Sequence, residues 1–63
     1  MNYKATPVYV VMRHDKVTDD KTPVAVFKDL ATATGNADGY NLDMTERNID
    51  GIHFYIAVTM LYE

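Results

Sequence analysis

The clearest hydrophobic pattern in the chain is an alternation near its C-terminal end. Every even-numbered residue from 52 to 62 is apolar: Ile52, Phe54, Ile56, Val58, Met60 and Tyr62. A period of two is typical of a β-strand that buries one face. The odd-numbered residues are His53, Tyr55, Ala57, Thr59 and Leu61, so the second face of this strand is not strongly polar either.

Two further strands are predicted in the first half of the chain. Residues 7–14 (PVYVVMRH) are rich in Val and Tyr, which favour strands. Residues 23–27 (PVAVF) form a shorter strand with Pro at its first position, where a missing N–H does least harm. The polar residues 15–22 between them are predicted to be a solvated loop or hairpin tip.

After Phe27 the apolar spacing changes from two to three and four, which indicates an amphipathic helix. Asp29 stands where a helix cap or first-turn acid is expected. Gly39 and Asn41 are predicted to end the helix, and residues 41–51 to form a turn-rich connection. A helix this short needs packing on the sheet to be stable.

These elements predict one α+β domain over residues 1–63 with the order β-β-α-β. The expected architecture is a three-stranded antiparallel sheet of order 2-1-3 with the helix on one face. The buried face is expected to combine Val8, Val10, Met12, Val24 and Val26 with the even-numbered residues of the last strand, against Leu30, Ala33 and Ala37. The opposite face is expected to carry Tyr9, Val11, Tyr55, Ala57 and Leu61.

That second face is the predicted partner site, because one helix covers only one face of a sheet. Large exposed apolar patches are unusual on monomers, and Tyr is enriched at interfaces. A homodimer through this face or an edge strand is expected, with a second protein as a further partner. An uncovered face that simply tolerates solvent is the alternative. A domain of 63 residues also gains little stability from a single core.

Composition narrows the functional classes. A net charge of −3, with only six scattered basic residues, argues against direct nucleic-acid binding. The chain has no Cys, which fits a reducing cytoplasm, and no signal peptide or apolar run long enough for a membrane span is apparent. Asp19, Asp20, Asp43 and Glu46 lie in two loops that could form an acidic rim, so a DNA mimic is an alternative function.

Catalytic and metal chemistry find little support. His14 and His53 are expected near one end of the sheet, but the predicted faces separate them, so no metal site is expected. Residues 34–45 lack the acid at position one and the Glu at position twelve of a calcium loop. The absence of Ser and Cys excludes the common acyl-transfer nucleophiles. No cofactor and no enzyme activity are expected.

The segments VYVV, VAVFKDLATATGNADGYN and HFYIAVTMLYE resemble small uncharacterised accessory proteins of phages and prophages. The resemblance rests on a strand ending in VF, a helix with Ala at four-residue spacing and a final aromatic-rich strand. It implies an accessory protein of a mobile element, a group that includes inhibitors of host enzymes and of host defence systems, which act by binding. Together with the homodimer expected from the second face, this predicts a non-catalytic inhibitor or modulator of a host protein in the host cytoplasm. An oligomer that binds or sequesters a small ligand such as a nucleotide is the other alternative.

Overall fold

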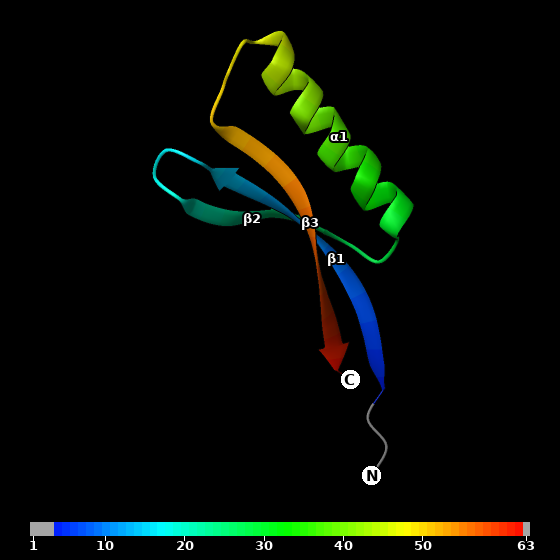
Figure 1. Ribbon diagram of the computed structural model, residues 1–63. Coiled ribbons are helices and arrows are strands. Elements are labelled where there is room, and N and C mark those ends of the chain that lie inside the picture. The colour runs from blue at the N-terminus through cyan, green and yellow to red at the C-terminus, as the bar shows by residue number, and fades with distance from the viewer. Residues whose placement is uncertain (1–3, 63) are drawn as a thin grey trace.

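The fold is a three-stranded antiparallel sheet with one helix packed on one face, and the order of the strands is β2-β1-β3 (Figure 1). The computed structural model describes residues 4–62. It contains β1 (Ala5–Asp15), β2 (Asp20–Phe27), α1 (Leu30–Glu46) and β3 (Ile52–Tyr62). The predicted α+β fold and its β-β-α-β order are confirmed.

The first hairpin has a shorter turn than the sequence predicts. The carboxylate of Asp15 accepts hydrogen bonds from the backbone N–H groups of Val17 and Thr18, at 2.9 and 3.3 Å. Asp19 adopts a positive φ of 61°, a conformation that Asp tolerates well. These two features close the chain within four residues, so β1 and β2 already pair at Asp15 and Asp20.

Helix α1 begins where predicted but ends later. The side chain of Asp29 caps it by accepting the N–H of Thr32 at 2.8 Å. The helix then continues through both internal glycines, and it ends where Asn48 takes a positive φ of 56°. The N–H of Ile49 bonds to the carbonyl of Met44, and that of Asn48 to Thr45, which is a Schellman ending. The predicted stop at Gly39 and Asn41 is wrong.

The core lies between α1 and the sheet, and it corrects the predicted faces. Val11 and Ala33 are fully buried, and Ala37 and Phe54 are nearly so. Val11 pairs with Ile56 in the β1–β3 ladder, so the even-numbered residues of β3 share a face with the odd-numbered residues of β1. Tyr9 and Val11 therefore face the helix. The core at this face also includes Ala25, Phe27, Met44, Ile52 and Ile56.

The molecule is long and thin because β1 and β3 continue beyond the helix as a two-stranded ribbon (Figure 1). Its extents are 51 × 24 × 11 Å and its radius of gyration is 13.8 Å. A compact chain of this length has a radius of gyration of about 11 Å. Within residues 4–62, no helix is long and apolar enough to cross a bilayer.

Candidate functional site

The face of the sheet that points away from α1 is covered by no other helix or strand within residues 4–62, and we call it the open face. It is formed by alternate residues of the three strands, which the ladder registers place on one side. Its members are Val8, Val10, Met12, His14, Lys21, Pro23, Val26, His53, Tyr55, Ala57, Thr59 and Leu61.

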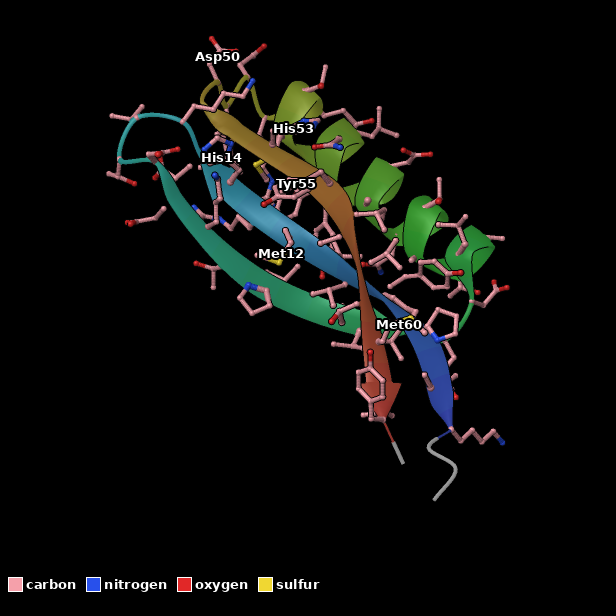
Figure 2. The ribbon with its side chains drawn as sticks, turned by 60° about the horizontal axis from the view of Figure 1, so that its bottom comes forward. Met12, His14, Asp50, His53, Tyr55 and Met60 are labelled. Atoms are coloured by element: carbon pink, nitrogen blue, oxygen red, sulfur yellow. The ribbon has the colours of Figure 1, made fainter. Side chains whose placement is uncertain are left out.

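The middle of the open face is apolar and only partly exposed. Val10 pairs with both Val26 and Ala57. Met12 pairs with Tyr55, and both side chains are labelled in Figure 2. Val10, Met12, Tyr55 and Ala57 are half-buried, because neighbouring strands shield them even without a covering layer. Met and aromatic side chains are enriched in protein interfaces, and charged residues are depleted from the centres of interfaces. The composition of this face therefore suits contact with another protein.

The structure divides the predicted partner-binding set between the two faces. Tyr55, Ala57 and Leu61 lie on the open face, whereas Tyr9 and Val11 face the helix. Val11 is 0% exposed, so its predicted place on an accessible surface is wrong. Val8, Val10, Met12 and Val26 are predicted to lie in the core, and the register places them on the open face instead, where Val8 is nevertheless buried at 8% exposure. The strand register is what assigns them, since β1 is apolar at both odd and even positions.

The two histidines are direct cross-strand partners at one end of the open face. The prediction that they lie on opposite faces is wrong, for the same reason of register. His14 Nε2 lies 2.8 Å from Asp19 Oδ1, while the ring of His53 stacks on that of Tyr55 at a centroid distance of 6.5 Å. Among residues 4–62, no group of three or more His, Cys, Asp or Glu side chains could hold a metal ion.

The β1–β2 turn and the α1–β3 loop meet at this end of the sheet, but the predicted acidic rim does not lie in two loops, because Asp43 and Glu46 are on α1 and Asp20 is in β2. The N–H of Lys16 donates to the carbonyl of Gly51 at 2.6 Å and joins the β1–β2 turn to the α1–β3 loop. Several of the acids have nearby polar or basic partners. The hydrogen bond from His14 lowers the pKa of Asp19, and Asp43 forms an ion pair with Arg47 at 3.2 Å.

Asp20 accepts a hydrogen bond from the hydroxyl of Thr18 at 3.1 Å, and Glu46 is the last residue of α1. Two of the four acids, Asp19 and Asp43, thus contact a basic side chain. The field of the rim is weaker than the number of carboxylates suggests.

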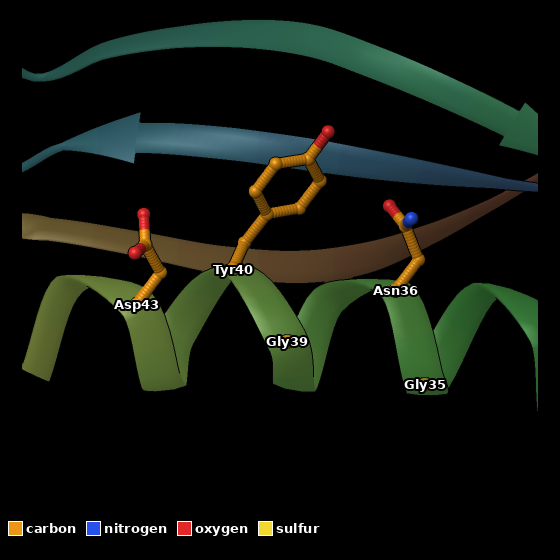
Figure 3. Close-up of a pocket in the computed structure, with 5 residues that line it drawn as sticks. All are labelled: Gly35, Asn36, Gly39, Tyr40 and Asp43. Atoms are coloured by element: carbon orange, nitrogen blue, oxygen red, sulfur yellow. The ribbon is translucent and has the colours of Figure 1, made fainter. Parts of the chain in front are cut away.

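A shallow depression runs along α1 and is a second place where a ligand could rest (Figure 3). It is lined by Gly35, Asn36, Gly39, Tyr40 and Asp43. Tyr40 stacks on Phe54 with ring centroids 4.7 Å apart, so its ring is part of the packing between helix and sheet. The depression offers one carboxylate, one amide and one phenol without a nucleophile, which does not favour a catalytic site.

Comparison with protein-family models, with curated proteins and with solved structures finds no match to this chain.

Proposed function

We propose that the chain is a non-catalytic protein-binding module that contacts its partner through the open face of the sheet. The observation that carries this proposal is the apolar centre formed by Val10, Met12, Val26, Tyr55 and Ala57, which no helix or strand of the described residues covers. Side chains on a solvated sheet face normally alternate with a polar set, and here the uncovered set is apolar. Burial of such a surface against another molecule removes apolar area from water, which lowers the free energy.

The chemistry of the open face indicates the kind of partner. Its members include no Asp or Glu, although the whole chain carries a net charge of −3. Lys21, His14 and His53 lie together at one end of it, since Lys21 and His53 both pair with His14. A protein with an apolar patch bordered by an acidic group fits this arrangement, because a complementary charge at the rim orients the complex.

A role as an inhibitor or modulator of a host protein remains the role that the resemblance to phage accessory proteins implies. Binding through an apolar face requires no catalytic group, which agrees with such a role. An acidic DNA mimic has less support, since Asp19 and Asp43 interact with His14 and Arg47. A mimic would need these carboxylates to be available to a basic groove.

The test is affinity capture from a lysate of the source cell, read by mass spectrometry, with three forms of the protein. Tyr55→Glu places a charge at the centre of the open face. Leu42→Glu is the control for the added charge, because Leu42 is an exposed apolar residue on α1, away from the open face. We expect a protein that is retained by the wild type and by Leu42→Glu and is lost with Tyr55→Glu.

The same set of proteins on all three forms would contradict binding through the open face. Far-UV circular dichroism of Tyr55→Glu must show the wild-type spectrum, so that loss of binding is separated from loss of fold. If no protein binds and a nucleotide raises the melting temperature, the ligand-binding alternative replaces this proposal.

A further inference from the structure

A β-sheet exposes unpaired backbone N–H and C=O groups along its edges, and most edges of this sheet carry a device that blocks further pairing. The outer edge of β2 has Asp20, Lys21 and Pro23. The register between β1 and β2 also shifts at this point, because Met12 pairs with Pro23 while Val11 pairs with Ala25. Charges, proline and a bulge are the features by which natural edges avoid association.

The second edge belongs to the first residues of β1, which extend past the end of β2. The β1–β2 pairing ends at Tyr9 and Phe27, so the preceding residues of β1 pair with β3 only. Pro7 lies in this stretch and has no N–H to offer a further strand. This edge is also protected.

Two independent observations show which residues of β3 direct their backbone N–H and C=O groups toward the outer edge of the sheet. The side-chain amide of Asn41 accepts the N–H of Phe54 and donates to its C=O, both at 2.9 Å, so both backbone groups point away from β1. Pro7 lies opposite Met60, and a pair that contains proline cannot exchange two ladder hydrogen bonds. Both observations show that the backbone N–H and C=O groups of the even-numbered β3 residues point away from β1. At Phe54 these groups are already bonded to Asn41, so no further strand can pair there.

Residues 56–62 of β3 are left without such protection. Their outward positions are Ile56, Val58, Met60 and Tyr62, and β3 pairs with no strand other than β1 within residues 4–62. The segment IAVTMLY contains no charge, no proline and no glycine. The side chains of Val58, Met60 and Tyr62 are exposed, because α1 does not extend over this part of the strand.

We propose that two copies of the chain pair antiparallel through this edge, which we call the β3 edge, and form a continuous six-stranded sheet. The register that uses every unblocked position and leaves Asn41 in place is centred on Thr59. Ile56 then pairs with Tyr62 and Val58 with Met60, each pair in both directions. These four pairs would exchange about eight backbone hydrogen bonds across the dimer axis. This inference goes beyond the proposed function and does not depend on it.

A second copy fits this edge better than an unrelated strand because the segment is complementary to itself. The antiparallel register places apolar residues beside apolar residues, and Thr59 beside Thr59, a pair that stabilises sheets. The acidic loops lie at the Ile52 end of the strand, since Asp15 pairs with Ile52. The proposed register therefore holds the acidic ends of the two copies at opposite extremes of the dimer.

The ribbon itself gains from this pairing. A two-stranded ribbon is marginal in water, and three or more strands are needed for independent stability. Pairing would give the ends of β1 and β3 a four-stranded sheet. The dimer axis runs perpendicular to the sheet, so the two open faces lie on the same side and form one larger surface.

The first test uses two valines with the same side-chain exposure. Val58 lies on the β3 edge and Val26 lies in β2 on the open face, and both are 62% exposed. We expect sedimentation equilibrium to give the wild type twice the 7.1 kDa mass of one chain. Val58→Lys should raise the dimer Kd by at least about tenfold, while Val26→Lys leaves it unchanged.

A monomeric wild type would overturn the proposal. So would a dimer that survives Val58→Lys, or one that Val26→Lys disrupts equally, since the contact would then involve another surface. Circular dichroism of Val58→Lys establishes that the monomer keeps its fold.

The second test measures the register and does not depend on the lysine variants. The chain has no Cys, so a single Thr59→Cys supplies the only thiol. In the proposed dimer the two Thr59 Cα atoms lie about 4.5 Å apart, within the range of a disulfide. The Ala57 residues lie about 13 Å apart, because four residues separate them along the strand.

Mild oxidation should therefore cross-link Thr59→Cys into a covalent dimer several-fold faster than Ala57→Cys. Equal rates, or faster cross-linking at Ala57→Cys, would overturn this register.

Discussion

Val11 lies directly opposite Ile56, and their pairing places the odd-numbered residues of β1 and the even-numbered residues of β3 on the core face of the sheet. Val11 is fully buried beneath α1, whereas its neighbour Val10 lies on the open face. Val11→Ala should lower the free energy of unfolding by about 2 kcal/mol, from lost burial and an unfilled cavity. Val10→Ala should cost clearly less. Urea denaturation measures both, and a larger loss for Val10→Ala would show that the faces are reversed.

The sequence predicted the types of the elements and the strand order, but it could not assign the faces. The period of two in β3 is clear because its even-numbered residues are large and apolar. In β1 the run from Val8 to Met12 is apolar at every position, so either parity could face the core. The register decides between them, and the register depends on the geometry of the hairpin and the crossover. For this reason the sequence pattern alone predicts the wrong face for Tyr9 and Val11.

The sequence pattern also does not predict where α1 ends. Gly39 and Asn41 are stop signals only when the chain adopts a left-handed residue there, and here that residue is Asn48. The cap at Asp29 was predicted and is confirmed. No sequence pattern indicates that the side chain of Asn41 would bond to Phe54 in another element.

The bond pair between Asn41 and Phe54 should be important for stability. Asn41→Leu removes both hydrogen bonds and leaves two partly buried backbone groups of Phe54 without partners. We expect a loss of about 1 to 3 kcal/mol in the free energy of unfolding. Asn41→Asp keeps the acceptor for the N–H, but its ionised carboxylate has no donor for the C=O, so its loss should be intermediate at neutral pH. Thermal melts of the three forms test this order.

If Asn41→Leu proves as stable as the wild type, the contact contributes no net stabilisation. The same variant also leaves the backbone N–H and C=O of Phe54 unpaired, next to the β3 edge. It should therefore raise the tendency to aggregate, which light scattering detects.

Gly35 and Gly39 should each be replaceable by Ala with a gain in stability. Both lie within α1, and an added Cβ at either position meets no atom within 4 Å. Ala in a helix interior is more favourable than Gly by about 1 kcal/mol. Gly51 is the matched control, because its φ of 86° strains any other residue, so Gly51→Ala should destabilise the protein. Chemical denaturation of the three variants gives the signs, and a loss at Gly35 or Gly39 would indicate a contact that the structure does not contain.

Stability should fall on acidification because two carboxylates are better hydrogen-bonded in the folded chain. The hydroxyl and the N–H of Thr32 lower the pKa of Asp29 below its ordinary value of 3.8. The N–H groups of Val17 and Thr18 likewise lower the pKa of Asp15. The unfolded state then binds protons more readily, so the stabilisation is complete above about pH 5 and is lost as the pH falls through the folded pKa values.

The measurement is urea denaturation at several pH values below neutrality. A variant with Asp15→Asn and Asp29→Asn keeps side-chain acceptors but cannot titrate at these sites. Its stability should fall less steeply than that of the wild type below about pH 4. Equal slopes for the two proteins would contradict the role of these carboxylates.

The pairing of Ala5 with Tyr62 has a consequence for how the chain acquires its structure. The β1–β2 hairpin joins neighbours in sequence and can form early, whereas the β1–β3 ladder must first close the loop between Asp15 and Ile52 and ends with a pair that spans nearly the whole described chain. Contacts of such high sequence separation form slowly, because the entropy of loop closure is lost before the contacts stabilise anything. During synthesis, one side of β1 therefore stays unpaired until β3 has left the ribosome. In that interval β1 is an extended apolar segment of the kind that chaperones bind.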